Sequence, residues 1–240
     1  MEPLASIVIP MFRDRATIGA TLDALALFLG TTGWSAEVII VNDGGTDGGV
    51  EIVKEKMKQR AFLKLIDRAV NRGKGFTVRE GIAAARGNFI FFTDADLPYG
   101  TEPILKMLEL LRNGAADVVL ANRNIAETAK KPSWARQITH VIYSYFVRSL
   151  IPITFSDTLA GLKALTKSAA QRIIPKLTID RFSFDVELLL AAKRAGFRIQ
   201  EVPVSLKNVG TSNLRIRRDA PEMIREIVQI FLKDKKGQYR

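Results

Sequence analysis

Asn88-Phe89-Ile90-Phe91-Phe92-Thr93-Asp94-Ala95-Asp96 is an apolar run that ends abruptly in two carboxylates. A continuous apolar run of this length is typical of a strand that is buried on both faces of a parallel sheet. Acidic side chains follow such a strand where it ends at a cleft, and ligands bind at the carboxyl ends of strands in open parallel sheets. The stretch therefore predicts a buried strand whose end, at Asp94 and Asp96, lies in a binding site.

Strand-like and helix-like segments alternate through the first half of the chain. Five apolar, β-branched runs predict strands at residues 6–9, 37–41, 63–66, 88–93 and 117–120. Helical spacing is found between them, at residues 18–29, 50–60, 75–85 and 103–112. Strands that alternate with helices form a parallel sheet covered on both faces. The predicted fold is therefore α/β, with a mostly parallel sheet flanked by helices.

The second half is less regular. Residues 160–165 and 202–206 are candidate strands, residues 184–195 predict a helix, and residues 133–150 and 221–232 predict amphipathic helices rich in Arg and Lys. Pro221 is expected in the first turn of the last helix, where proline is well tolerated. Because the sequence contains no internal repeat and no low-complexity linker, residues 1–240 are expected to form a single domain.

The net charge of +11 is concentrated in the second half. Residues 1–120 contain 14 Lys and Arg against 15 Asp and Glu, a net charge of −1, whereas residues 121–240 contain 22 against 10, a net charge of +12. A basic half of this kind is compatible with nucleic acid, an anionic membrane surface or a phosphorylated substrate. The alternative is a surface that only keeps the protein soluble.

Composition also narrows the cellular setting. The chain contains no cysteine, which excludes disulfides and thiolate chemistry and fits a reducing compartment. No apolar run approaches the roughly 20 residues that a membrane-spanning helix needs. The first residues lack the pattern of a signal peptide. A cytoplasmic protein without a spanning helix is therefore expected.

Asp94 and Asp96 favour chemistry on a nucleotide-activated substrate. Asp94 and Asp96 can hold a hard divalent cation through oxygen, and the cation can hold a diphosphate. The alternative interpretation is a strand followed by an acidic turn. Lys74 lies between Gly73 and Gly75, so the backbone can approach a ligand closely and the amine can reach a phosphate.

Seven motifs in a fixed order carry a family resemblance. They are Ile7-Val8-Ile9-Pro10-Met11-Phe12-Arg13-Asp14, Val41-Asn42-Asp43-Gly44-Gly45-Thr46-Asp47-Gly48, Asn71-Arg72-Gly73-Lys74-Gly75-Phe76-Thr77-Val78-Arg79-Glu80-Gly81, Asp94-Ala95-Asp96, Asn122-Arg123, Asp157-Thr158-Leu159-Ala160-Gly161-Leu162-Lys163 and Phe184-Asp185-Val186-Glu187-Leu188-Leu189. The ordered set resembles the family 2 glycosyltransferases of the GT-A (Rossmann-like) fold. Within that family it is most similar to the dolichyl-phosphate, or polyprenyl-phosphate, glucosyl- and mannosyltransferases. The Gly-Lys-Gly segment and Arg181–Glu187 are slightly closer to the glucosyl relatives.

The resemblance implies a nucleotide-sugar-binding half at residues 1–120. The binding residues that it indicates are Pro10, Phe12, Asp14, Asp43, Lys74 and Asp94. Asp43 resembles the residue that contacts the base or ribose, and Asp94 and Asp96 would hold Mg²⁺ or Mn²⁺ on the diphosphate. For Phe12, packing in the core is the alternative.

The resemblance also implies a basic acceptor-binding half at residues 121–240. The indicated acceptor-phosphate residues are Arg123, Arg136 and His140. The indicated catalytic residues are Asp94, Asp96, Arg123, Asp157, Asp185 and Glu187. The last three acids would orient the site or be purely structural, and His140 would donate to the phosphate or simply face solvent.

The scarcity of conventional bases favours a phosphate acceptor. The chain has one histidine and no cysteine. A sugar hydroxyl acceptor needs a general base, whereas a phosphate monoester is already ionised near neutral pH and needs cations instead. Arg suits this role because its planar fork binds phosphate through two hydrogen bonds.

The expected function is therefore inverting, metal-dependent transfer of a hexose from a nucleotide sugar of the UDP-glucose or GDP-mannose type to a polyprenyl or dolichyl phosphate. The alternatives are a transferase with a soluble or glycan acceptor and a non-catalytic sugar-nucleotide-binding module. Nucleic acid is not expected as a partner, because no recognisable binding motif accompanies the basic half. Peripheral association with the cytoplasmic face of an anionic membrane is expected, since the acceptor is embedded in a bilayer.

Overall fold

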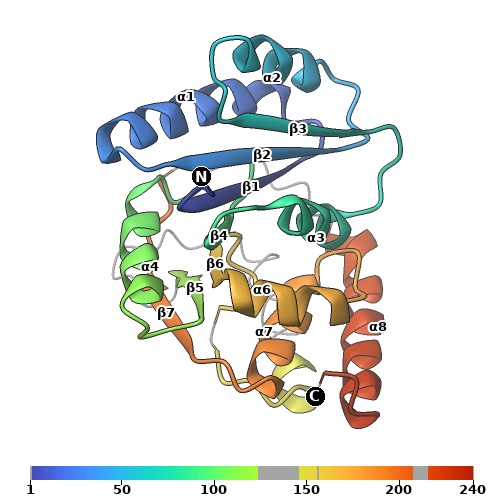
Figure 1. Cartoon of the computed structure of the whole chain (residues 1–240). Coiled ribbons are helices and arrows are strands. Elements are labelled where there is room, and N and C mark those ends of the chain that lie inside the picture. The colour runs from blue at the N-terminus through green and yellow to red at the C-terminus, as the bar shows by residue number, and fades with distance from the viewer. Residues whose placement is uncertain (1, 124–145, 156, 208–215, 240) are drawn as a thin grey trace.

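A computed structural model describes residues 2–123, 146–155, 157–207 and 216–239 of the chain, with the side chains of residues 216–220 left aside (Figure 1). Arg136, His140 and residues 133–145 of the helix predicted at residues 133–150 lie outside these ranges. Residues 146–150 of that segment are helical.

Seven strands form one sheet in the order β3-β2-β1-β4-β6-β5-β7. The strands are β1 (Ala5–Met11), β2 (Ala36–Asp43), β3 (Leu63–Arg68), β4 (Phe89–Phe92), β5 (Val118–Asn122), β6 (Lys163–Thr166) and β7 (Ile199–Pro203). All neighbouring pairs are parallel except those of β6, which runs antiparallel to both β4 and β5. The mostly parallel sheet expected from the sequence is confirmed.

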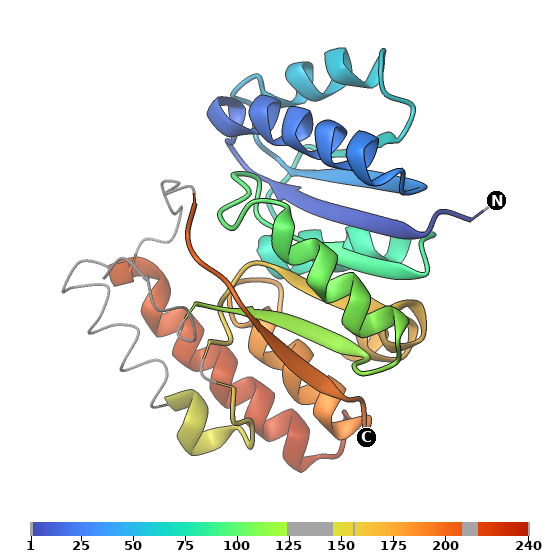
Figure 2. The ribbon, with the colours of Figure 1, turned by 90° about the vertical axis from the view of Figure 1, so that its left-hand side faces the viewer.

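Helices connect the strands and cover both faces of the sheet (Figures 1 and 2). They are α1 (Arg15–Thr32), α2 (Gly49–Met57), α3 (Lys74–Ala84), α4 (Glu102–Arg112), α6 (Lys167–Ile173), the short 3₁₀ turn η2 (Ile174–Lys176), α7 (Phe184–Arg194) and α8 (Ile216–Lys235). The four helices predicted in the first half all form within a few residues of the expected bounds.

The core consists of two apolar layers, one on each face of the sheet. Side chains alternate along a strand, so Ile7 and Ile9 pack with α1, α2 and α4, whereas Val8 packs with α3, α6, α7 and α8. The same alternation places Phe91 in the first layer and Phe92 in the second. The two layers therefore hold the central strands β1 and β4 from both faces of the sheet.

Three predictions for the second half need correction. The strand expected at residues 160–165 is β6, which begins only at Lys163, and the strand expected at residues 202–206 is β7, which begins at Ile199 and pairs in parallel with β5. Pro221 lies inside α8 and not in its first turn, because the helix already includes Ile216. Short irregular segments precede both strands, and hydropathy alone does not place such boundaries.

Within the described ranges, no helix is long and apolar enough to cross a membrane.

Candidate active site

The predicted site lies along one edge of the sheet, where the parallel strands β1, β2, β4 and β5 end. Asp43 is the last residue of β2, Thr93 and Asp94 follow β4, and Arg123 follows β5. The antiparallel strand β6 begins at this edge, so its first residue, Lys163, lies opposite Phe92 of β4 and Leu120 of β5. The topology thus gathers acidic and basic side chains from four strands at the edge where ligands bind in such sheets.

Asp94 forms an ion pair with Lys74, with 2.6 Å between Lys74 Nζ and Asp94 Oδ1. Their side chains are 37% and 21% exposed, so both groups remain accessible from the edge. Burial alone raises the pKa of the Asp94 carboxyl, but the Lys74 ammonium lowers that pKa below its ordinary value. Asp94 is therefore a carboxylate at neutral pH, and Lys74 is an ammonium beside it.

Gly161 is required by the position of Asp94. A Cβ atom at residue 161 would lie 2.6 Å from Cγ of Asp94, closer than any non-bonded carbon pair. The loop before β6 thus packs its bare backbone against the carboxylate. Lys163 holds this loop by donating to the carbonyl oxygen of Ala160 at 2.6 Å.

Further acids surround the Asp94 carboxylate. Burial, followed by the charge of Asp94, raises the pKa of the Asp96 carboxyl. Burial also raises the pKa of Asp14 to about 6, and the charges of Asp96, Asp47 and Asp94 add to this effect. The entrance to the site is therefore rich in negative charge, which a cation would neutralise.

The residues present fit a divalent metal that is shared with a diphosphate. Across the part of the chain that the structure describes, no group of three or more acidic or histidine side chains is placed to hold a metal ion alone. Mg²⁺ is usually held by one or two carboxylates together with substrate phosphates, and not by an all-protein cage. Asp94 and Asp96 meet that requirement.

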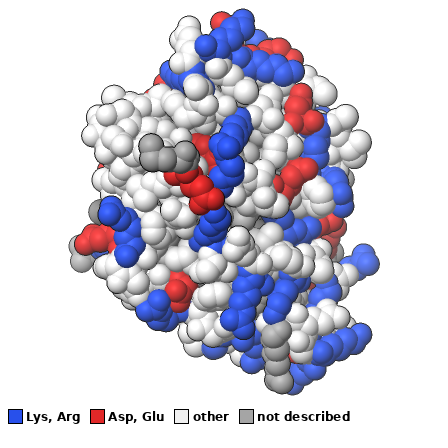
Figure 3. All heavy atoms as spheres, viewed as in Figure 1, with Lys and Arg blue, Asp and Glu red and all other residues white. Residues whose placement is uncertain are grey.

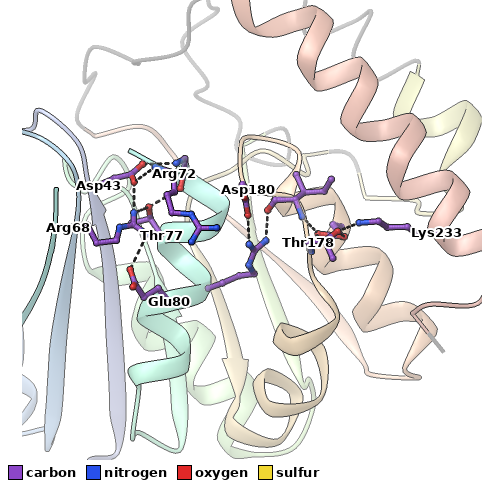
Figure 4. A network of polar contacts seen from close by, with 12 residues as sticks. Asp43, Arg68, Arg72, Thr77, Glu80, Thr178, Asp180 and Lys233 are labelled. Carbon is purple, nitrogen blue, oxygen red and sulfur yellow. Dashed lines mark hydrogen bonds and ion pairs between the residues drawn. The ribbon is translucent and has the colours of Figure 1, made fainter. Parts of the chain in front are cut away.

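Asp43 is almost fully buried, and its carboxylate is occupied by protein donors (Figure 4). It accepts hydrogen bonds from the backbone N–H groups of Arg72 at 2.7 Å and Gly73 at 2.9 Å, and it pairs with the guanidinium of Arg68. Arg68 also donates to Thr77 Oγ1 at 2.7 Å. Asp43 therefore fixes the start of the Gly-Lys-Gly segment from within, a role that its place in the motif did not reveal.

The two glycines beside Lys74 allow close packing of protein against protein. A Cβ at Gly73 would lie 2.5 Å from the carbonyl oxygen of Asp180, and a Cβ at Gly75 would lie 2.5 Å from that of Ile179. Gly73 also has a φ of +100°, which side-chain-bearing residues rarely adopt. The close approach that these glycines allow in the structure is to the protein's own segment 178–181. Their approach to a ligand stays a prediction.

Arg123 and Asp157 form a two-pronged ion pair. The guanidinium donates from Nε and Nη2 to the two oxygens of Asp157, each at 2.7 Å, and the Arg123 backbone N–H adds a third bond at 2.9 Å. Burial raises the pKa of the Asp157 carboxyl, but Arg123 lowers it below its ordinary value overall. Asp157 is only 1% exposed, whereas Arg123 is 32% exposed. Asp157 thus orients an arginine that faces the site.

Asp185 and Glu187 bind different parts of the protein. Asp185 accepts from the fully buried Lys163 at 2.7 Å and so supports the loop that carries Gly161. Glu187 is fully buried and binds Thr178, Ile179 and Tyr239. Both acids therefore hold other residues of the protein in place, and their role in orienting the site stays a prediction.

The remaining nucleotide-side residues lie where β1 ends. Pro10 is half-buried within β1, and Phe12, also half-buried, belongs to neither core layer. Arg13 lies with its guanidinium carbon 5.2 Å from the centre of the Phe12 ring. The core-packing alternative for Phe12 thus gains no support.

Two buried residues of the site were not singled out in the sequence. Lys163 is one residue of a longer motif, and nothing in the sequence indicated that it is fully buried. A fully buried lysine requires an acidic partner. Tyr99 is 3% exposed, and burial raises its pKa to about 12. The charges of Arg123, Asp157, Asp94 and Lys74 also act on Tyr99, so it lies among the groups of the site. The sequence feature that could have indicated Tyr99 is its position three residues after Asp96.

Comparisons with known proteins show the family of this chain. The sequence model of the family described as glycosyl transferase family 2 matches residues 6–174. A dolichyl-phosphate beta-glucosyltransferase of Dictyostelium discoideum is 27% identical over 238 residues, covering 94% of this chain and 73% of the relative. The enzyme of the same name from Saccharomyces cerevisiae is 28% identical over 263 residues, covering 100% and 77%.

Solved structures with the same fold include two complexes. A mannosyltransferase of Pyrobaculum calidifontis with GDP-Man and Mn²⁺ has a TM-score of 0.64 at 18% identity, covering 98% of this chain. This chain spans only 65% of that protein. A glucosyl-3-phosphoglycerate synthase of Mycobacterium tuberculosis with Mg²⁺ and UDP has a TM-score of 0.70 at 15% identity, covering 96% and 79%. At such identities the likeness shows the fold alone, and the expected GT-A fold is confirmed.

Proposed function

This chain belongs to glycosyl transferase family 2, and we propose that it transfers a hexose from a nucleotide sugar to a polyprenyl phosphate such as dolichyl phosphate, inverting the anomeric carbon. The observation that carries the proposal is the Asp94 carboxylate, held at the end of β4 between the Lys74 ammonium and the backbone of Gly161. Relatives named dolichyl-phosphate beta-glucosyltransferase support the acceptor, and they favour glucose over mannose as the sugar.

On the donor side, Lys74, Asp94 and Asp96 would bind the diphosphate. Asp94 and Asp96 would hold Mg²⁺ or Mn²⁺, which when bound neutralises the charge that develops on the leaving diphosphate. Lys74 adds a fixed positive charge from the protein itself. Structures of proteins with this fold that contain Mn²⁺ or Mg²⁺ support a divalent metal here.

On the acceptor side, Arg123 would bind the phosphate of the lipid. A phosphate oxygen attacks the anomeric carbon as the bond from that carbon to the diphosphate oxygen breaks, and the nucleoside diphosphate leaves. No general base is needed because the attacking oxygen is already ionised. Asp157 keeps the Arg123 fork oriented, and Arg136 and His140, outside the described residues, stay predicted contributors.

An acceptor panel tests the proposal. Release of nucleoside diphosphate from UDP-glucose and GDP-mannose is measured with dolichyl phosphate, unphosphorylated dolichol and 3-phosphoglycerate, each with Mn²⁺ or Mg²⁺. We expect turnover with dolichyl phosphate only. Turnover with 3-phosphoglycerate in its place would establish a soluble acceptor and contradict the proposal.

Replacing Arg123 with Lys tests the acceptor-phosphate role. Lysine keeps the charge, but a single ammonium cannot both hold Asp157 as the Arg123 fork does and donate to the phosphate. Transfer should therefore fall by about tenfold or more, in line with the loss of one charged hydrogen bond. Arg198 provides a matched control. It pairs with Asp117 through Nε, Nη2 and its backbone N–H in the same way. Asp117 precedes β5 and Arg198 precedes β7, so this pair lies at the opposite edge of the sheet.

Arg198→Lys should leave transfer intact. It should also lower the melting temperature less than Arg123→Lys does, because Asp157 is 1% exposed and Asp117 is 21% exposed. Unchanged transfer in Arg123→Lys, or a loss explained entirely by unfolding, would show that Arg123 serves only the ion pair with Asp157.

We also propose peripheral association with anionic membranes through α8. Val228 and Leu232 on this helix are 40% and 51% exposed, and Lys233, Lys235 and Lys236 follow them at its end. Figure 3 shows that Lys and Arg gather over α6 and α8 on this side of the molecule. Apolar and basic side chains side by side are typical of interfacial helices, and each basic residue contributes up to about 1 kcal/mol at an anionic surface.

Flotation with liposomes measures this association. The chain should float with anionic vesicles at low salt and detach at high salt, since salt screens exposed charges. The double variant Lys235→Glu with Lys236→Glu should float less. Equal binding to neutral and anionic vesicles, or none at low salt, would contradict electrostatic docking.

A further inference from the structure

Glu187 is the centre of a buried hydrogen-bond cluster that the transfer reaction does not use directly. Its carboxylate accepts from the backbone N–H groups of Thr178 and Ile179, both at 2.8 Å, and from Thr178 Oγ1 at 3.0 Å. The fourth donor is the hydroxyl of Tyr239, at 2.7 Å. Among the residues that the structure describes, no Lys or Arg forms an ion pair with Glu187, so these four donors balance its charge.

Tyr239 reaches this cluster from far along the chain. Its side chain is fully buried, 52 residues away from Glu187 in the sequence. Lys233 of α8 also donates to Thr178 (Figure 4). The segment 178–181 is therefore held from behind by side chains of α7, α8 and the residues after α8.

The front of the same segment packs against the Gly-Lys-Gly turn. The carbonyl oxygen of Asp180 accepts from the backbone N–H of Phe76 at 3.0 Å, and that of Ile179 accepts from Arg79 at 2.6 Å. The glycines at 73 and 75 leave no gap between these carbonyls and the turn. Figure 4 shows the segment between α3 and α8. Any shift of residues 178–181 must therefore shift the backbone that carries Lys74.

We infer that Tyr239 and Glu187 are positioning residues for Lys74, and that they thereby set the affinity for the donor diphosphate. The inference rests on the proposed function, which places Lys74 on that diphosphate. The hydroxyl of Tyr239 fixes one oxygen of Glu187, Glu187 fixes the amides of Thr178 and Ile179, and these residues support the turn. Lys74 then meets Asp94 at 2.6 Å without having to be ordered by the ligand.

Tyr239→Phe is the test variant, because it removes one hydroxyl and keeps the buried ring. Binding of UDP and of GDP, each with Mn²⁺, is measured by calorimetry. We expect the affinity of the nucleotide that binds the wild type to fall by about tenfold. The Glu187 carboxylate loses one of its donors, so that the ligand must order the turn that carries Lys74 when it binds. Hydrogen exchange should become faster in residues 73–76 and 178–181, with or without nucleotide.

Ser6→Ala is the matched control. Ser6 is also fully buried and donates its hydroxyl to a carboxylate, Glu37 Oε1, at 2.6 Å. It lies near the start of β1, at the sheet edge opposite the site. Ser6→Ala should lower stability comparably but leave nucleotide affinity within about twofold of the wild type.

A double-mutant cycle tests whether Tyr239 acts through Lys74. In a Lys74→Ala background, Tyr239→Phe should weaken nucleotide binding no further. An equal loss in both backgrounds, or the same affinity in Tyr239→Phe and Ser6→Ala, would overturn the inference while leaving the proposed function in place. If neither nucleotide binds the wild type, the proposed function fails, and this inference fails with it.

Discussion

Asp96→Asn is expected to lower kcat/KM for sugar transfer by about 10²-fold or more, the effect typical of losing a preorganised electrostatic contact to a leaving group. The amide keeps the shape of the side chain but removes one of the two charges that would hold the metal. The melting temperature should not fall below that of the wild type, because Asp96 is half-buried and its carboxylate is repelled by the charge of Asp94. EDTA should lower the kcat/KM of the wild-type enzyme by a similar factor.

Asp23→Asn is the control for this variant. Asp23 is an acid of α1 that pairs with Lys56 and Arg60 away from the site, so its replacement should leave transfer unchanged. Full activity of Asp96→Asn, or of the wild type in EDTA, would contradict the assignment of the metal to Asp94 and Asp96.

Gly161→Ala should also lower transfer by about 10²-fold while leaving the fold intact. The new methyl group would overlap the Asp94 carboxylate, and that side chain can rotate away because it is flexible. Rotation would break the Asp94–Lys74 pair and displace the carboxylate from the diphosphate. A displacement of about 1 Å in a catalytic group can cost 10²-fold in rate.

Gly30→Ala separates this effect from a general effect of glycine replacement. Gly30 lies in α1, and a Cβ there would meet no atom within 4 Å. Gly30→Ala should keep full transfer and be slightly more stable, since alanine favours helix. If Gly161→Ala transfers sugar at the wild-type rate, then Asp94 does not depend on its contact with residue 161.

The succession of strands and helices along the first half was predictable because each strand is an apolar run bounded by turn residues. The run 88–93 and the carboxylates after it indicated both the central strand and the ligand-binding edge, and the structure places Asp94 there. The Gly-Lys-Gly motif likewise indicated that a lysine lies near this edge. Its pairing with Asp94 joins residues 20 apart in the sequence.

What the sequence did not reveal are the contacts between distant segments. The fork of Arg123 on Asp157 spans 34 residues, and the hydrogen bond from Tyr239 to Glu187 spans 52. Neither pairing has a local signature, because hydropathy and turn patterns report only on neighbouring residues. The role of Gly161 was hidden for the same reason, since only the folded chain brings its backbone against Asp94.

Sugar transfer to a lipid phosphate at the Asp94 site can be measured directly by the partition of labelled product. Purified protein is incubated with radiolabelled UDP-glucose or GDP-mannose, dolichyl phosphate and Mn²⁺, and the label that partitions into the organic phase is counted. We predict lipid-borne label that depends on dolichyl phosphate and falls by about 10²-fold or more in Asp96→Asn. Label that stays in the aqueous phase with both donors, or lipid-borne label of equal amount in Asp96→Asn, would contradict it.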